Sequence, residues 1–473
     1  MNDIFFEDIS SLSQLINTKK ISPVELVTAM LERISKVDPA LNSFIKVLSD
    51  SALEDAKQLE AEVVQGKSRG PLHGVPIAVK DILATAGIET TSGSKLFENW
   101  KPDGDATAIR KLKEAGAIII GKANLHEFAM GATTENPHYG VCRNPWDVSR
   151  IPGGSSGGSA VAVAAGMSFG ALGTDTAGSI RLPAALCGIV GIKPTYGRVS
   201  RHGCLPFSWS LDHIGPMTRT VKDSAIMLDA IAGYDRLDYT TSKRPNDVLF
   251  SEIANLKGVK LAVVKEHFFE DVDPEVCAIV QKAIADLKAL GADVLELELD
   301  GLGDVLQSLR VIAQSEVVAF HEPLLKKYKH LYGEDLQFRF NFGKSISATD
   351  YINAQRTRNV FIQHLTEKMA AYGVDAIVAP TNVKPPISIG SVPPEEAINN
   401  MFTMGRTPFA NIVGFPALTV PCGFVSAKLP VGLQLIGTPF AERKLFEIGH
   451  AYETSQNWIQ ELVSNKVYLE KLA

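Results

Sequence analysis

The chain has 473 residues, of which 45% are hydrophobic and 21% are charged, and 47 Lys and Arg against 53 Asp and Glu give a formal net charge of −6. These proportions are ordinary for a globular protein, and because no basic block stands out, direct binding of nucleic acid is not expected. The five cysteines are odd in number, scattered and without a Cys-x-x-Cys pair, which favours free thiols over a disulfide framework.

The first eight residues, MNDIFFED, lack the basic region and the apolar core of a secretory signal. The longest run of small and apolar residues, 160–173, is shorter than the roughly 20 residues that cross a bilayer and is interrupted by glycine and serine. We therefore expect a cytoplasmic protein without a membrane segment.

The first clear element is a helix near the start of the chain. Ser22 is expected as its N-cap, Pro23 as its first residue and Glu25 as the partner of a capping box, and Pro39 is expected to end it. Strand and helix patterns then alternate along the chain. The further expected elements are strands at 75–79 and 117–121, a helix at 105–115 capped by Asp105, a helix of small residues from 157, strands at 259–264, 294–299 and 375–379, helices at 274–290 and 347–372, strands at 417–420 and 431–436, and a helix from about 441.

This alternation predicts the fold class. Repeated strand–helix units indicate an α/β layer architecture with helices on both faces of a largely buried sheet. Without an internal repeat or an evident linker, we expect a single domain over 1–473. Segment 234–258 is either a surface loop or a short linker.

A central block, about 122–220, is rich in Gly, Ser, Thr and Pro and contains the glycine–serine motif Gly153-Gly-Ser-Ser-Gly-Gly-Ser159. We interpret this block as the functional centre, because loops on a rigid scaffold carry sites. Gly-x-Ser-x-Gly centred on Ser156 is typical of a nucleophile elbow, but Pro145 and Pro152 argue against the strand that must precede an elbow. The motif also lacks the Gly-Lys-Ser/Thr ending of a phosphate-binding loop, and a flexible turn is the remaining alternative.

A second serine, Ser179, follows in Asp175-Thr-Ala-Gly-Ser-Ile-Arg181. The two motifs together offer candidate nucleophiles and backbone N–H donors, both of which acyl transfer requires. Neither contains histidine, so the candidate base is Lys80, at the end of the apolar run 75–79. Lowering its pKa from an ordinary value near 10.4 to about 7.5 costs about 4 kcal/mol, which burial can supply. The alternative is a lysine that reaches the surface, and Asp81 is expected on the opposite face of the strand.

A metal site is not expected. His126-Glu127 begins like the helix of a zinc protease, but residue 130 is methionine where a second histidine is required. The other histidines are dispersed along the chain. We therefore expect neither a metal nor another cofactor.

Taken together, these motifs resemble the amidase signature family. The match extends over nearly the whole chain and is densest at 74–81, 153–159, 173–183, 191–197 and 212–216. The resemblance implies that family's fold, a large, mixed and mostly buried β-sheet covered by helices on both faces. It also implies a Ser–cis-Ser–Lys triad with Ser179 as nucleophile, Ser155 as the bridging serine after a cis peptide bond, and Lys80 as base.

The same resemblance implies how an amide would be cleaved. Lys80 takes a proton through the bridging serine, Ser179 attacks the amide carbonyl, and water hydrolyses the acyl-enzyme. The oxyanion hole is expected to consist of the backbone N–H groups of Thr176, Ala177, Gly178 and Ser179, and Met130 is expected among the substrate-binding residues. Ala177 stands where many members have glycine, and its N–H still serves if its φ is negative.

Two functions follow from the resemblance. The main hypothesis is a stand-alone amidase that releases ammonia or an amine from a carboxamide. The alternative is the A subunit of a glutamine-dependent aminoacyl-tRNA amidotransferase, which residues 123–131 resemble. Arg339 matches a basic residue of glutamine-directed members, whereas 401–404 offers Met-Phe-Thr-Met where they place an acid, and this favours an aryl or alkyl amide.

A catalytically inactive binding protein is disfavoured, because all three triad positions are intact. The expected partner is a small-molecule amide, without direct contact to nucleic acid or membrane, and a homodimer is an expectation from the family. Esters stay open as substrates, because they pass through the same acyl-enzyme.

Overall fold

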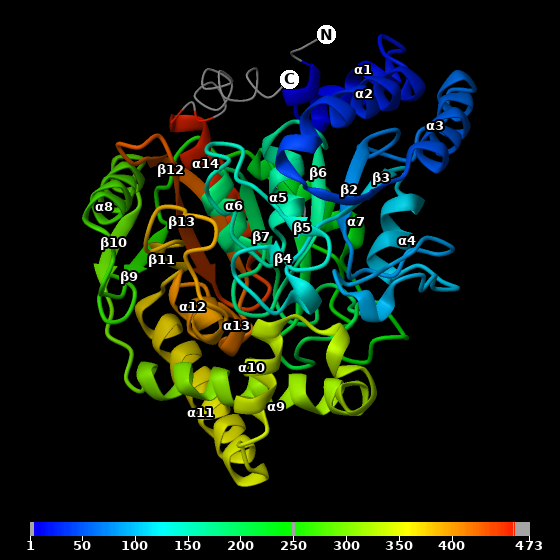
Figure 1. The fold of residues 1–473 in the computed structure, drawn as a ribbon. Helices are drawn as coiled ribbons and strands as arrows, with labels where there is room; N and C mark the ends of the chain where they lie inside the picture. Colours follow the sequence, from blue (N-terminus) through cyan, green and yellow to red (C-terminus); the bar gives the residue numbers. More distant parts are fainter. Residues whose placement is uncertain (1–3, 248–250, 457, 459–473) are drawn as a thin grey trace.

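The centre of the molecule is one large sheet. The computed structural model describes residues 4–247, 251–456 and 458, and in this part of the chain 11 strands pair in the order β1-β3-β2-β6-β8-β7-β12-β13-β11-β9-β10 (Figure 1). These strands are β1 (Phe44–Val47), β2 (Pro76–Lys80), β3 (Ile118–Ala123), β6 (Gly170–Asp175), β7 (Val190–Lys193), β8 (His213–Thr218), β9 (Lys260–Val263), β10 (Asp293–Glu296), β11 (Ala376–Pro380), β12 (Ala417–Phe424) and β13 (Pro430–Gly437). A separate pair consists of β4 (Glu135–Asn136) and β5 (Gly140–Val141).

The sheet is mixed, which confirms the expected fold class. β2 runs parallel to β3 and to β6, whereas β6 is antiparallel to β8, and β12 and β13 form an antiparallel hairpin. This hairpin is longer than the strands expected at 417–420 and 431–436, because its pairing continues past an irregularity between Pro421 and Gly423.

Helices cover both faces of the sheet. The helices of the described residues are α1 (Ile9–Asn17), α2 (Pro23–Leu41), α3 (Ser49–Val64), α4 (Thr107–Glu114), α5 (Gly157–Ala164), α6 (Arg181–Cys187), α7 (Val221–Ile231), α8 (Pro274–Ala289), α9 (Leu302–Tyr328), α10 (Glu334–Gly343), α11 (Ala348–Tyr372), α12 (Ala397–Thr403), α13 (Pro408–Val413) and α14 (Glu442–Gln456). A Cβ added at Gly432 of β13 would lie 2.5 Å from Ala185 of α6, whereas one at Gly437 would lie 3.1 Å from Leu445 of α14. Strand residues an odd number of positions apart point to opposite faces, so α6 and α14 pack on opposite sides.

A further layer of helices lies beyond one end of the sheet. α9, α10 and α11 gather there (Figure 1), and their buried apolar side chains belong to the same cluster as Met130, Ala177 and Phe409. The sequence does not predict α9 or α10, whose N-caps make no side-chain hydrogen bond. Among the described helices, none is both long and apolar enough to cross a bilayer.

The end of α2 differs from the prediction. Ser22 and Glu25 form the expected capping box, but Pro39 lies inside the helix, which continues to Leu41 and ends at Asn42 with a φ of 53°. A proline this close to the end removes one backbone hydrogen bond, and the remaining turn still forms.

The start of α4 also differs. Asp105 does not cap it, because the N-cap is Ala106 and no side chain bonds there. The Asp105 carboxylate instead accepts a hydrogen bond from the Ala86 N–H (2.8 Å) and pairs with Lys113 (2.9 Å). The Asp105 carboxylate, which the local pattern assigned to the N-cap, is therefore bonded to residues outside this helix terminus.

Residues 234–247 form a packed surface loop. The Ser242 N–H donates to the Gly197 carbonyl (2.9 Å), and Thr107 donates its hydroxyl hydrogen to Asp235 (2.6 Å). Of the two alternatives for 234–258, these contacts favour the loop over a free linker.

The capping box of α2 should have a measurable effect on stability. Ser22→Ala removes the acceptor for the Glu25 N–H (3.0 Å) and should lower the free energy of unfolding by about 1 kcal/mol in urea denaturation. Ser35→Ala, an exposed change inside the same helix, is the control and should alter it by less than about 0.5 kcal/mol. Equal losses in both variants would contradict the assignment.

Candidate active site

The residues expected to form the triad come from three places in the fold. Lys80 is the last residue of β2, Ser155 directly precedes Ser156, the N-cap of α5, and Ser179 lies between β6 and α6. Lys80 Nζ donates to Ser155 Oγ at 2.7 Å, and the Ser156 N–H donates to the Ser179 carbonyl at 3.2 Å. The Gly154–Ser155 peptide bond is cis. The fold thus places Lys80 in contact with Ser155 and holds the two serine segments together.

Ser156, the other serine of the motif, has structural contacts. Its hydroxyl donates to the Thr174 carbonyl (3.1 Å) and accepts from the Thr174 N–H (3.2 Å). Residues 151–156 form no strand, so Ser156 does not lie on a nucleophile elbow.

Lys80 is fully buried beside neutral groups. Its amine also donates to Thr174 Oγ1 at 2.7 Å, and among the described residues no carboxylate lies within ion-pair distance of it. Burial lowers the pKa of Lys80 to about 7, although Cys204 and more distant carboxylates act in the opposite direction. Lys122, the neighbouring buried lysine, differs because it pairs with Asp81 (3.4 Å). Lys80 is therefore able to be neutral near pH 7 and to act as a base.

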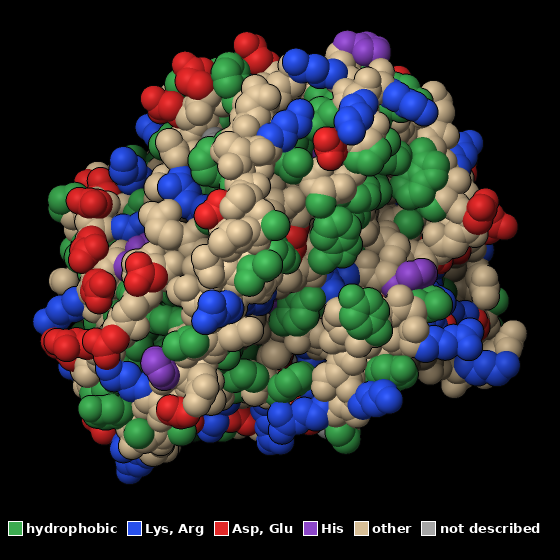
Figure 2. Space-filling view, turned by 90° about the horizontal axis from the view of Figure 1, so that it is seen from below, with side chains coloured by type: hydrophobic (Ala, Val, Ile, Leu, Met, Phe, Trp, Pro, Cys, Tyr) green, Lys and Arg blue, Asp and Glu red, His purple; other side chains and the backbone are tan. Residues whose placement is uncertain are grey.

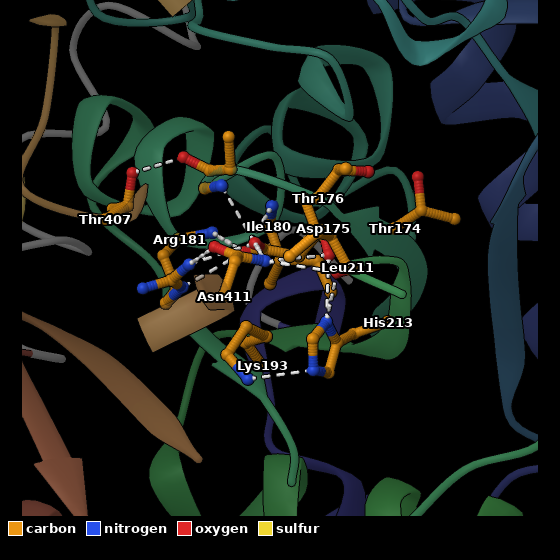
Figure 3. Close-up of polar contacts among 12 residues, drawn as sticks. Thr174, Asp175, Thr176, Ile180, Arg181, Lys193, Leu211, His213, Thr407 and Asn411 are labelled. Atoms are coloured by element: carbon orange, nitrogen blue, oxygen red, sulfur yellow. Dashed lines mark hydrogen bonds and ion pairs between the residues drawn. The ribbon is translucent and has the colours of Figure 1, made fainter. Parts of the chain in front are cut away.

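The loop that carries Ser179 is organised by the Asp175 carboxylate. This carboxylate accepts hydrogen bonds from the N–H groups of Gly178 (2.8 Å) and Ile180 (3.2 Å) (Figure 3). The Gly178 N–H, expected in the oxyanion hole, is thus already bonded in this structure. Gly178 has a φ of +126°, and a Cβ there would collide with Thr407. Its role in this structure is to let the loop turn against Thr407.

Three backbone N–H groups of the same loop, all expected in the oxyanion hole, remain available to donate. Within the described residues, those of Thr176, Ala177 and Ser179 donate no hydrogen bond. Ala177 is not among the residues with positive φ, so the condition for its N–H to serve in place of glycine is met. Met130 is buried in the same apolar cluster as Ala177.

A buried ion pair fixes this loop against the rest of the molecule (Figure 3). Arg181 donates to both Asp175 oxygens, at 2.9 and 3.0 Å, and also to Asn411 (2.6 Å) and Gln434 (2.5 Å). Burial alone would raise the pKa of Asp175, but the Arg181 guanidinium holds it well below its usual range. The charge that organises the loop is thereby compensated in place.

Asp212 supports the loop from another side. Its carboxylate accepts hydrogen bonds from the Thr176 hydroxyl (2.6 Å) and from the N–H groups of Phe207 and Ser208 (2.9 Å each). Burial raises the pKa of Asp212 to about 6 against these hydrogen bonds. Thr176 is therefore held through its side chain while its N–H stays available.

A cavity of about 220 Å³ lies beside the Gly154–Ser155 segment. Its wall includes Thr133, whose backbone nitrogen would lie 2.9 Å from a Cβ at Gly154, and His126, whose N–H donates to the Ser155 carbonyl (3.2 Å). Further lining residues are Ala132, Glu135, Pro137, Glu334, Asp335, Arg339, Val392, Pro394, Ala397 and Asn400. The cavity therefore offers a guanidinium and several carboxylates beside the segment that carries Ser155.

His126 and Arg339 are linked through one carboxylate. The Asp335 carboxylate lies 2.9 Å from His126 Nε2 and 3.9 Å from Arg339 Nε. The His126 ring is therefore part of a polar pocket. Among the described residues, no cluster of three or more His, Cys, Asp or Glu side chains is placed to hold a metal ion.

Several residues of the site are missed by the sequence prediction. Thr174 and Asp212 lie inside the matched motifs 173–183 and 212–216, so motif membership is the signal that points to them. Asn411 contacts the Asp175 carboxylate (2.8 Å) from 236 residues away, and no local pattern indicates this contact.

Comparison with known proteins identifies the family. A family model for amidases matches residues 25–446. The chain belongs to the amidase family. It is therefore an amidase-family enzyme, a hydrolase that acts on amides.

Relatives of this amidase are similar along nearly its whole length. The A subunit of glutamyl-tRNA(Gln) amidotransferase from Moorella thermoacetica is 39% identical, with 96% of this chain and 98% of the relative covered. The solved structure of the same protein from Thermotoga maritima is 36% identical, with a TM-score of 0.79 and 95% of both chains covered. The peptide amidase of Stenotrophomonas maltophilia is 32% identical, with a TM-score of 0.82 and 95% of this chain and 97% of that chain covered.

The Asp175–Arg181 pair should dominate the stability of the site. Asp175→Asn leaves the Arg181 guanidinium buried without its counter-charge and should lower the free energy of unfolding by about 3–5 kcal/mol. Asp147→Asn breaks a half-exposed pair with Arg150 (3.1 Å) and should cost about 1 kcal/mol or less. Urea denaturation compares the two, and a small loss for Asp175→Asn would contradict the role of this pair.

Proposed function

We propose that this amidase hydrolyses the side-chain carboxamide of glutamine through an acyl-enzyme on Ser179 and releases ammonia. The supporting observation is the cavity beside Ser155, where Arg339 and Asp335 lie on α10. A guanidinium and a carboxylate are the groups that recognise the α-carboxylate and the α-ammonium of a free amino acid. The relatives named for glutamyl-tRNA(Gln) amidotransferase support the same choice and favour it over a stand-alone amidase.

The proposed mechanism starts from the observed contact between Lys80 and Ser155. Neutral Lys80 takes the proton of Ser155 as Ser155 takes that of Ser179, whose oxygen bonds to the amide carbon. The N–H groups of Thr176, Ala177 and Ser179 stabilise the oxyanion. The proton returns through the same relay to the nitrogen, the C–N bond breaks and ammonia leaves. Water then takes the place of the amine, and glutamate is released.

The name of these relatives also indicates which kind of partner this chain would bind. They are called subunits, and we propose that this chain likewise supplies ammonia within a complex with another protein. This favours a different protein as the partner over the homodimer expected from the family. It leaves the chemistry on this chain unchanged, because Lys80, Ser155 and Ser179 all come from it.

One observation favours a second candidate, a neutral aryl or alkyl amide. Met404 lies where glutamine-directed members are expected to carry an acid, and it packs against the apolar cluster that contains Met130 and Ala177. The side chain of Met401 lies outside the described residues. An apolar contact at this point suits an uncharged acyl group.

The pH dependence should report the ionisation of Lys80. A base must be unprotonated, so kcat/KM for the preferred amide should rise through pH about 7 and level off above it. Asp212→Asn removes a carboxylate whose charge raises the pKa of Lys80, so it should move the inflection to lower pH without abolishing it. A kcat/KM profile that stays flat or falls as the pH rises from about 5 to about 9 would contradict a neutral Lys80 as base.

A substrate pair distinguishes the two candidate functions. Glutamine should be hydrolysed in preference to hexanamide, and Arg339→Met should lower kcat/KM for glutamine by about 10- to 100-fold because a charge-assisted hydrogen bond is lost. Hexanamide hydrolysis should be nearly unchanged in the same variant, which also shows that the variant folds. A wild-type preference for hexanamide, or equal losses on both substrates, would favour the neutral amide instead.

A further inference from the structure

Glu127 is a fully buried side chain that has no part in the proposed proton relay. Its Oε1 accepts a hydrogen bond from the Ser94 hydroxyl (2.5 Å) and lies 3.0 Å from His138 Nε2. Its Oε2 accepts a hydrogen bond from the N–H of Gly333 (2.8 Å), which is 206 residues away in the sequence. Because a buried carboxylate needs such partners, this one joins the segment around Glu127 to a distant part of the chain.

The bond to Gly333 fixes the start of α10. Gly333 is the N-cap of this helix and makes no side-chain capping hydrogen bond of its own. A carboxylate at this end of a helix also interacts favourably with the helix dipole. A Cβ at Gly333 would lie 2.8 Å from Glu127 Oε2 and 2.9 Å from the Pro137 ring, so a glycine is needed for the helix to begin this close to the carboxylate.

α10 depends on inward contacts because it lies in the outer layer of helices. Figure 2 is seen from the end of the molecule where α9, α10 and α11 gather, and it shows large hydrophobic side chains exposed there among charged ones. On α10, Phe338 and Phe342 are 44% and 49% exposed, whereas Phe340 is buried. One face of the helix is covered and the other is not, so contacts such as that of Glu127 decide where the helix lies.

His126, the neighbour of Glu127, adds a second link to α10. Its ring lies 2.9 Å from the carboxylate of Asp335 in the first turn of the helix. Its backbone N–H donates to the Ser155 carbonyl at 3.2 Å. Residues 126 and 127 therefore connect the start of α10 with the backbone of the bridging serine.

The turn that follows has a strained backbone. Phe128 and Ala129 have φ of 51° and 61°, in the left-handed region that residues with a side chain rarely adopt. Strain of this kind gathers at functional sites and persists where the surroundings hold it. The Phe128 ring packs at 5.4 Å between ring centres against Tyr332, which directly precedes Gly333. This packing holds the turn against the same end of α10.

The two residues that the proposed function assigns to glutamine lie on this helix. Asp335 and Arg339 are four positions apart on α10, so they share one face, and their charged groups approach to 3.9 Å. The position of α10 relative to Ser155 therefore sets the distance between the amino-acid end of glutamine and its amide. A misplacement of about 1 Å in such an arrangement costs up to about 100-fold in rate.

We propose that Glu127 is a positioning residue, which holds the start of α10, and with it the two residues assigned to glutamine, in place against the segment of Ser155. The inference rests on the proposed function and adds a determinant of specificity to it. Glu127 moves no proton in the reaction. It acts on a substrate whose amino-acid end is bound by α10 and not on an amide that lacks this end.

Two variants disturb the contact from opposite sides. Glu127→Ala removes the acceptor, and Gly333→Ala places a methyl group 2.8 Å from the carboxylate. Each should raise KM for glutamine by about tenfold or more, change kcat by less than about threefold and leave kcat/KM for hexanamide nearly unchanged. Ser94→Ala, which removes a hydrogen bond to the other oxygen of the same carboxylate, is the matched control and should leave KM for glutamine near its wild-type value.

A conservative variant and the second substrate separate positioning from folding. Glu127→Gln keeps an oxygen that accepts from the Gly333 N–H, so KM for glutamine should return to within about threefold of the wild type. Hexanamide hydrolysis shows that a variant folds, and if Glu127→Ala alone does not fold, Gly333→Ala decides.

Several outcomes would overturn the inference. Equal losses on glutamine and hexanamide, an unchanged KM for glutamine in both variants, or loss of folding in both would contradict a positioning role. A glutamine preference that is lost in Arg339→Met and kept in both variants contradicts this inference alone. A wild-type enzyme that prefers hexanamide contradicts the proposed function and, with it, the inference.

Discussion

A lysine amine buried with no carboxylate of the described residues within ion-pair distance is the constraint on which the rest of the active site depends. Moving a charged ammonium out of water is expensive unless an opposite charge accompanies it, so the Lys80 amine is stabilised in its neutral form. Lys122 shows the other solution within the same sheet, because Asp81 lies 3.4 Å from its amine. Two hydroxyls, those of Ser155 and Thr174, surround Lys80 instead, and one of them belongs to the proposed proton relay.

The topology of the sheet delivers these groups to one place. β2 and β6 are parallel and paired, so their carboxyl ends lie at the same edge. Lys80 ends β2, and the loop with Ser179 follows the end of β6, while Ser155, near the N-terminus of α5, contacts the Lys80 amine. The buried Asp175–Arg181 pair then fixes the loop, in which three N–H groups have no acceptor among the described residues.

Local chemistry makes part of this structure predictable. The capping box at Ser22 depends on residues three positions apart, and it forms as the sequence indicates. The local pattern assigns Asp105 to a cap, but its carboxylate bonds Ala86 and Lys113, because a carboxylate takes the strongest partners that the folded chain brings near it. α9 begins after Gly301 without a side-chain cap, so its start has no capping motif from which the sequence could predict it.

The same division applies to the site. The motifs around Lys80, Ser155 and Ser179 point to their roles through family resemblance, and the contact of Lys80 with Ser155 agrees with that geometry. The commitment of the Gly178 N–H to Asp175 is not predictable, since it depends on how the loop closes. Asn411 joins the site from more than 200 residues away, a distance at which spacing carries no information.

The central claim is that Ser179, activated through Ser155 by neutral Lys80, carries the acyl group. Incubation with a slowly hydrolysed aryl ester, acid quench and peptide mapping by mass spectrometry would locate the acyl group directly. We predict one acyl group per chain, on the peptide that contains Ser179, and none in Ser179→Ala. An acyl group on Ser155 or Ser156, or undiminished acylation of Ser179→Ala, would contradict the claim.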